Sequence, residues 1–213
     1  MGRAIDVTGD VILGVNTLWM VYCVGRGVPI PMQNFNERQA LDGLKNLDSQ
    51  VIGAVYDRYF PEVYRYVRFR LGDEPTAEDI ASDVFVRLLE AVQNRRGPQT
   101  NLKAWLLATA SHAVVDHLRR VYRRATESLP EDLSDPDPAP AELFDEREQK
   151  RTVRQAYARL TSDQQHVLAL RFSQGYSLEE TASVMKKNVN AVKALQFRAL
   201  AALQRNIEEM NDD

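Results

Sequence analysis

The sequence predicts an all-α protein made of two small helical domains that are joined by an acidic flexible linker. Apolar residues recur every three or four positions through most of the chain, which is the spacing of one helix face. No alternation of apolar and polar residues of the length that a strand needs appears in the sequence. A stretch rich in proline, aspartate and glutamate, TESLPEDLSDPDPAPAELFDE, separates the two helical blocks.

Composition limits the classes of function. The 213 residues suffice for one ordinary domain or two small ones, and a hydrophobic content of 44% allows a real core. Cys23 is the only cysteine, so an intrachain disulfide and a cysteine-cluster metal site are excluded. A single cysteine fits a reducing compartment, and we expect a cytoplasmic protein.

Residues 1–35 do not share the helical pattern, and we expect them to be an extension. Residues 11–25 are apolar but shorter than the roughly 20 residues that a membrane span needs. They lack a strongly basic leader and a clear cleavage site, which argues against a signal peptide. Two interpretations stay open: a start assigned too early, for which Met32 is the alternative, or a genuine pro-segment or membrane-touching segment.

Residues 36–125 form the first predicted domain. Apolar residues at helical spacing predict helix from Asn36 to Arg70. Thr76, with Asp79 three residues later, resembles a capping box that opens the next helix. A polar loop containing Gly-Pro follows, and Asn101 can cap a long helix that runs to about residue 124.

The end of this long helix is strongly basic. It carries four arginines: Arg119, Arg120, Arg123 and Arg124. Arginines four residues apart repel each other, so the cluster lowers the stability of the helix. The helix dipole favours cations at this end, but it explains one or two arginines rather than four. A polyanion, with nucleic-acid phosphate as the first choice, explains the cluster better.

The preceding helix has the opposite charge. It contains one basic residue, Arg87, and six acidic ones: Asp73, Glu74, Glu78, Asp79, Asp83 and Glu90. Nucleic acid would avoid this helix, which is either a solvated surface or a docking surface for a basic protein partner. This separation of charge reconciles a net charge of −3 with nucleic-acid binding.

The linker is predicted over residues 126–148, where four prolines prevent a long uninterrupted helix. The second domain spans residues 149–207, and an acidic tail covers residues 208–213. Within this domain, Thr161 or Ser162 caps a helix that ends at Gly175.

A helix-turn-helix is predicted next. Ser177 and Glu180 form a capping box for a short helix, and Asn188 is a good N-cap for the last one. The exposed side of the last helix offers residue types that read base edges or hold phosphates: Asn190, Lys193, Gln196 and Arg198. The alternative is a plain three-helix bundle with a solvated polar face.

Taken together, these stretches resemble the extracytoplasmic-function (group IV) sigma factors of bacterial RNA polymerase. The start of the family's region 2 is similar to VYDRYFPEVYRYVRFRLGDEPTAEDIASDVFVRLLEAV. Its promoter-melting helix is similar to NLKAWLLATASHAVVDHLRRVYRR, and region 4 is similar to LTSDQQHVLALRFSQGYSLEETASVMKKNVNAVKALQFRALAAL. The resemblance covers roughly residues 50–125 and 150–205, with both modules in the family's order.

The resemblance implies roles for individual residues. Binding of the clamp coiled coil of the polymerase's largest subunit falls to Asp79, Asp83 and Arg87. Recognition of the minus-ten element, including capture of a flipped base, falls to Asn94, Arg96, Asn101, Trp105, His112, Arg119, Arg120, Arg123 and Arg124. Recognition of the minus-thirty-five element falls to Asn188, Asn190, Lys193, Gln196 and Arg198. The implied partners are core RNA polymerase, through that clamp and the flap, promoter DNA, and an anti-sigma factor.

The sequence departs from the family's pattern at three places. Ala194-Leu195 stands where the usual Ser-Arg follows the lysine, so the resemblance does not give the minus-thirty-five sequence that is read. Ser111 and His112 stand where the family often has Arg-Asn. The turn of the helix-turn-helix is MKKN where glycine is common, so a left-handed conformation at Lys186 would cost roughly 1 kcal/mol.

Two other classes compete with this interpretation. An enzyme is disfavoured because His112 and His117 are off the i,i+4 spacing of a helical metal pair and no phosphate-binding loop occurs. We therefore expect no catalytic residue, no metal, no cofactor and no small-molecule substrate. A stand-alone helix-turn-helix regulator would explain the second domain but would leave the first without a purpose.

Overall fold

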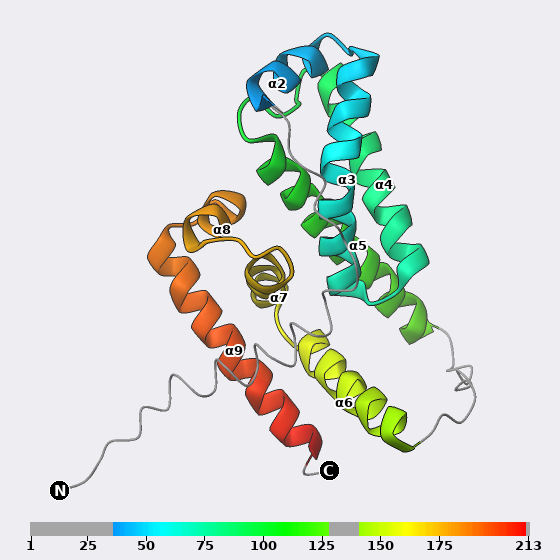
Figure 1. The fold of residues 1–213 in the computed structure, drawn as a ribbon. Coiled ribbons are helices and arrows are strands. Elements are labelled where there is room, and N and C mark those ends of the chain that lie inside the picture. Colours follow the sequence, from blue (N-terminus) through cyan, green and yellow to red (C-terminus); the bar gives the residue numbers. More distant parts are fainter. Residues whose placement is uncertain (1–35, 128–140, 212–213) are drawn as a thin grey trace, which may run out of the picture.

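The computed structural model describes residues 36–127 and 141–211, and within these ranges the chain is helical with no strand (Figure 1). The first domain contains α2 (Glu37–Lys45), α3 (Ser49–Leu71), α4 (Glu74–Gln93) and α5 (Leu102–Glu127). The second contains α6 (Ala141–Ala158), α7 (Ser162–Leu168), the π-helical turn η1 (Ala169–Ser173), α8 (Leu178–Met185) and α9 (Val189–Asn211). The predicted fold class is confirmed.

Several expectations concern residues outside those ranges. They are the N-terminal extension with Cys23, residues 128–140 of the linker, and the last two residues of the acidic tail. Helix occupies both ends of the expected linker, because α5 runs to Glu127 and α6 begins at Ala141.

Two helix starts in the first domain differ from expectation. The apolar spacing continues through a break between α2 and α3, where Leu47 is left-handed with a φ of 53° and Asp48 caps α3. Helix α4 begins before Thr76, because the Asp73 carboxylate accepts the backbone N–H of Thr76 at 2.9 Å. That hydrogen bond lowers the pKa of Asp73. The capping box expected at Thr76 is therefore wrong.

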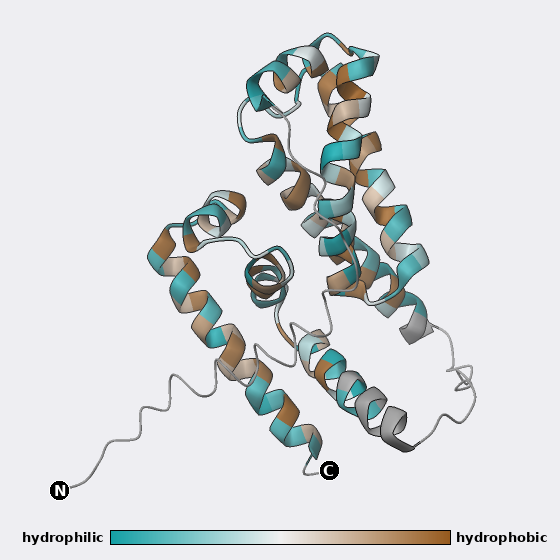
Figure 2. Cartoon of the chain, viewed as in Figure 1, coloured by the Kyte–Doolittle hydropathy of each residue, from teal (hydrophilic) through white to brown (hydrophobic). Residues whose placement is uncertain are grey.

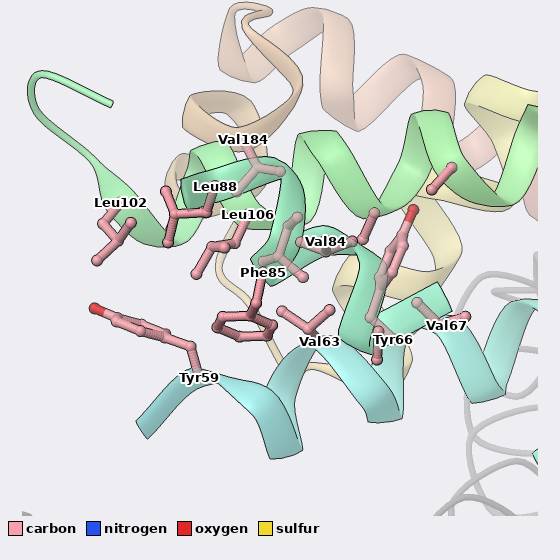
Figure 3. Close-up of a cluster of buried hydrophobic side chains, with 14 of the residues drawn as sticks. Tyr59, Val63, Tyr66, Val67, Val84, Phe85, Leu88, Leu102, Leu106 and Val184 are labelled. Carbon is pink, nitrogen blue, oxygen red and sulfur yellow. The ribbon is translucent and has the colours of Figure 1, made fainter. Parts of the chain in front are cut away.

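The core of the first domain lies between α3, α4 and α5. Figure 3 shows Val63 and Tyr66 from α3 pointing toward Val84 and Phe85 of α4, with Leu106 of α5 beside them. These side chains are almost completely buried. Apolar and polar residues alternate along each helix in Figure 2, which is the pattern of an amphipathic helix with one apolar face.

The caps of the second domain are those that the sequence predicts. Thr161 and Gln164 form a capping box on α7, and Ser177 and Glu180 form one on α8. Lys186 ends α8 in a left-handed conformation, with φ 52° and ψ 42°, as expected if the turn has no glycine. None of the described helices is long and apolar enough to cross a bilayer.

The two domains share one continuous apolar core. Leu170 and Val184 of the second domain are buried in the same cluster as the first domain's core residues. Figure 3 shows Val184 of α8 beside Leu88 and Leu106. The helical bundle of the first domain is thus closed on one side by α7, η1 and α8 (Figure 1).

Candidate nucleic-acid interface

The arginine cluster lies on the free end of α5. Arg119, Arg120, Arg123 and Arg124 are all exposed. Within the described residues, the carboxylate that pairs with this cluster is that of Asp116, whose Oδ1 is 3.9 Å from Arg119 Nη1. At that distance and exposure the ion pair is weak, so Asp116 neutralises little of the positive potential of the cluster.

The apolar stripe from His112 to Tyr122 predicts that α5 docks along its whole length, but the end of this stripe is exposed among the arginines. Leu118 and Val121 are exposed, and Tyr122 is 77% exposed. Their i, i+3, i+4 spacing continues the apolar stripe of α5 beyond the point where the core ends.

The loop between α4 and α5 brings together three of the predicted residues. Asn94 ends α4 and donates its side-chain N–H to the Glu90 carbonyl at 2.8 Å, so it has a structural role here. Arg96 is exposed. Asn101 caps α5, as predicted, by accepting the Ala104 N–H at 2.8 Å. A hollow of about 400 Å³ lies beside this loop, lined by Leu41, Leu44, Lys45, Val92, Arg95, Gly97, Pro98 and Gln99.

The start of α5 is held by a residue that the sequence did not single out. Glu37 of α2 accepts the Leu102 N–H at 2.7 Å, so α2 fixes the point at which α5 enters the bundle. Trp105, one turn later, is half-buried and packs against the core of the first domain. His112 is exposed on the same helix, while Ser111 beside it is buried.

In the second domain, one face of the N-terminal half of α9 is exposed to solvent. Asn188 accepts the Ala191 N–H at 2.7 Å and is the N-cap that the sequence predicts. Asn190, Lys193 and Arg198 are exposed. The expectation that Gln196 shares this exposed side is wrong, because Gln196 is half-buried and its Oε1 accepts Arg171 Nε–H at 3.0 Å.

Phe197 was missed on this surface. It is 69% exposed between Gln196 and Arg198, although a phenylalanine in a helix usually packs into a core. An exposed aromatic ring beside cationic and amide side chains can contact thymine methyl groups.

The outer face of α4 is acidic, with one apolar residue at its centre. Asp79 is exposed, and Asp83 Oδ2 lies 2.7 Å from Arg87 Nε in an i,i+4 ion pair. Val86, which the sequence reasoning missed, is 52% exposed on the same face. A single exposed valine is common on protein surfaces, so the acidic face of α4 fits both a solvated surface and a docking surface for a basic partner. No group of three or more potential metal ligands occurs within the described ranges.

Comparison with known proteins finds two matching family models. The model of Sigma-70 region 2 matches residues 55–124, and the model of Sigma-70, region 4 matches residues 156–205. Together they cover more than half of the chain.

Individual proteins match over most of the chain. The ECF RNA polymerase sigma factor BldN of Streptomyces coelicolor is 35% identical over 160 residues, which cover 74% of this chain and 61% of BldN. The ECF RNA polymerase sigma factor SigX of Bacillus subtilis is 30% identical over 165 residues, covering 75% of this chain and 84% of SigX. The solved structure of CnrH in complex with the cytosolic domain of CnrY shares the fold, with 20% identity and a TM-score of 0.54 over 81% of this chain and 97% of that chain.

Proposed function

This chain belongs to the extracytoplasmic-function sigma factors of RNA polymerase, and we propose that it directs promoter-specific transcription initiation. The observation that carries the proposal is the presence of both modules in one chain, with a basic helix end in one and a polar recognition helix in the other. This makes it an alternative sigma factor rather than a stand-alone helix-turn-helix regulator. It performs no chemistry itself and acts in the cytoplasm, bound to the polymerase.

The first domain would bind the minus-ten element. The exposed arginines at the end of α5 contact phosphates, because guanidinium groups with few intramolecular partners can replace counterions on the DNA. Arg96 and Asn101 belong to the same α4–α5 loop as Arg95, Gly97 and Gln99, which line the hollow, and they would receive a base flipped out of the non-template strand. Contacts in the hollow must recover the few kcal/mol that unstacking a base costs. Trp105 and His112 belong to the same surface, with Trp105 half-buried and His112 exposed.

The second domain would bind the minus-thirty-five element through α9. Asn190, Lys193 and Arg198 reach the major groove from its exposed side, and Phe197 adds an apolar contact. Gln196 takes part only if its hydrogen bond to Arg171 breaks.

The acidic face of α4 would bind core polymerase. Asp79 and Asp83 face a basic surface of the clamp coiled coil of the largest subunit, and Val86 packs at the centre of the contact. A second contact joins the helix-turn-helix domain to the flap. An anti-sigma factor that covers either domain would prevent both kinds of binding.

Run-off transcription with core polymerase tests the proposal. Core enzyme and this chain are combined on sheared genomic DNA of the host, with core alone and core with a housekeeping sigma factor as controls. We expect discrete transcripts that neither control produces. No new transcript, under conditions in which the housekeeping factor works, would contradict the proposal.

Arg119→Ala with Arg123→Ala should weaken promoter binding and flatten its dependence on salt. Each lost phosphate contact lowers the slope of log K against log salt concentration by about 0.7 to 0.9, so the double variant should lose about 1.4 to 1.8. The measurement is promoter binding of the polymerase holoenzyme between 50 and 200 mM salt, roughly the range in which such contacts are felt. Arg38→Ala with Arg205→Ala removes two exposed arginines elsewhere and should leave the slope unchanged. An unchanged slope in the first variant would mean that those arginines face solvent in the complex.

A further inference from the structure

Helix α2 is a packed part of the first domain. Asn36 caps its N-terminus by accepting two backbone N–H groups. Leu41 and Leu44 are buried in the core of the domain. Gly43 lies so close to α3 that a Cβ atom there would stand only 2.6 Å from the side chain of Val51. The position of α2 relative to the rest of the bundle is therefore closely fixed.

The Glu37 carboxylate of α2 occupies the start of α5. Leu102 is the first residue of α5, so its N–H has no acceptor within that helix. Glu37 Oε1 accepts this N–H at 2.7 Å, which is a short hydrogen bond to a charged acceptor. The carboxylate also lies at the positive end of the α5 dipole, which strengthens the contact. Helix α2 thereby fixes the point at which the α4–α5 loop ends.

Tyr59 of α3 brings a third helix to the same point. Its side chain is buried, and burial first, and then the charge of Glu37, raises the pKa of its hydroxyl to about 12. Figure 3 shows Tyr59 and Leu102 at the same end of the apolar core. Glu37 therefore lies where α2, α3 and α5 meet. Its hydrogen bond to Leu102 is partly buried there, so solvent weakens it less than it would weaken an exposed one.

Helix α2 also forms one wall of the hollow beside the α4–α5 loop. Leu41, Leu44 and Lys45 line the hollow from α2, while Val92 and Pro98 line it from α4 and the loop. Four of these five side chains are apolar, and apolar walls suit the flat face of a base. The volume of about 400 Å³ lies within the range of pockets that hold small ligands.

Two exposed cations line the same hollow: Lys45 at the end of α2 and Arg95 in the loop. Lys45 Nζ lies 3.0 Å from Asp42 Oδ1, but both side chains are at least half exposed, so the pair is weak. Arg95 has a φ of 56°, and an arginine in this left-handed conformation costs roughly 1 kcal/mol more than a glycine would. Positive charge beside apolar walls favours an anionic ligand with a flat apolar part, and a nucleotide has both.

We propose that α2 is part of the minus-ten reader, in which Glu37 is a positioning residue for the α4–α5 loop and Lys45 and Arg95 hold the phosphates of the captured strand. The ligand is single-stranded nucleic acid with one base in the hollow. This inference rests on the proposed function, which places a flipped base there. It extends the reader beyond the region 2 family model, because that match begins at residue 55 and α2 precedes it.

Loss of the Glu37 contact should affect position rather than folding. Asn101 still caps α5 by accepting the Ala104 N–H at 2.8 Å, so the helix forms without Glu37. The Leu102 N–H would lose its acceptor, and the loop would lose its tie to α2. Hydrogen bonds from the loop to a base hold only between about 2.7 and 3.2 Å, so a small shift of the loop weakens the capture of that base.

Selection from a random pool tests the proposal. The probe is labelled single-stranded DNA with a randomised central stretch, and the protein is the holoenzyme of core polymerase with the full chain. Bound strands are sequenced, and the enrichment of each base at each position is compared among variants. Enrichment is a ratio between strands bound by the same sample. A variant that is partly unfolded therefore binds less DNA without changing this ratio.

Glu37→Ala should lower the enrichment of the captured base about tenfold, which is the effect of one or two lost hydrogen bonds. Glu37→Gln keeps a carbonyl acceptor for the Leu102 N–H and should retain most of the enrichment. Glu208→Ala removes an exposed glutamate on α9 and should change nothing. None of these variants should alter the dependence of binding on salt, because none removes a phosphate contact.

Lys45→Ala with Arg95→Gly should give the opposite result. Binding of the pool should weaken, and the slope of log K against log salt concentration should fall by about 1.4, at about 0.7 for each contact with a single strand. Enrichment of the captured base should stay within about twofold, because phosphate contacts carry no sequence information. Glycine replaces Arg95 because it adopts the left-handed conformation without strain.

The outcomes separate this inference from the proposed function. An enriched base that Glu37→Ala does not reduce, or that Glu37→Ala and Glu37→Gln reduce equally, would overturn the positioning role of Glu37. An unchanged slope in Lys45→Ala with Arg95→Gly would overturn the phosphate contacts. In both cases the proposed function stands, because the unaltered chain still selects a base. No enriched base with the unaltered chain would contradict the proposed function, and this inference with it.

Discussion

Asp79→Arg with Asp83→Arg is expected to weaken binding to core polymerase about a hundredfold, which corresponds to about 2.7 kcal/mol. The two carboxylates lie one turn apart on the outer face of α4 and both precede Val86, with Asp79 exposed and Asp83 partly exposed. Reversing them places two cations against a basic partner, and like charges brought together across an interface cost several kcal/mol. The reversal also removes the partner of Arg87, whose Nε lies 2.7 Å from Asp83.

The control for this variant is Asp57→Arg with Glu208→Arg, which makes the same change in net charge on α3 and α9. Both residues are exposed, and neither lies on α4. Affinity measured by fluorescence anisotropy of the labelled chain against core enzyme should fall for the first variant and stay within about threefold for the control. Equal losses in the two variants would mean that bulk charge, rather than the face of α4, determines binding.

Leu106→Ala is expected to lower the free energy of unfolding by about 2 to 5 kcal/mol. Leu106 is completely buried at the point where α3, α4 and α8 all contact α5, beside Val63, Leu88 and Val184 (Figure 3). Truncation leaves a cavity there, and close packing on every side limits how far the neighbours can relax. A loss of this size is a large part of the stability of a typical small domain.

Urea denaturation followed by circular dichroism measures this change. Leu118→Ala is the matched control, since it makes the same truncation on the same helix at a side chain that is 37% exposed. The control should cost less than about 1 kcal/mol. Similar losses at the two positions would contradict the described packing of α5.

The features of the fold that could be predicted from the sequence are those that depend on residues close together in the chain. The capping box of Ser177 and Glu180, and the caps at Asn101 and Asn188, were predicted correctly because each depends on residues within three positions. The break at Leu47 was missed because apolar spacing continues across it and leucine gives no sign of a left-handed conformation. The start of α4 was misplaced because Asp73 and Thr76 are both plausible caps in sequence.

Tertiary contacts explain most of what could not be predicted. Gln196 accepts a hydrogen bond from Arg171, which lies in the π-helical turn η1. No local sequence pattern predicts that turn. Arg70 and His166 are ordinary surface residue types in an amphipathic sequence, yet both are buried where the two domains meet. The roles of the exposed residues on α4, α5 and α9 come from the family resemblance, because exposure alone does not name a ligand.

Mapping the 5′ ends of transcripts tests most directly that one chain reads two promoter elements. Core polymerase with this chain transcribes sheared host DNA, and the start sites are aligned by sequencing. We expect the sites to share two upstream elements at a constant spacing, and Lys193→Ala with Arg198→Ala to reduce dependence on the upstream element only. Start sites that share a single element, or that match those of core enzyme alone, would contradict this function.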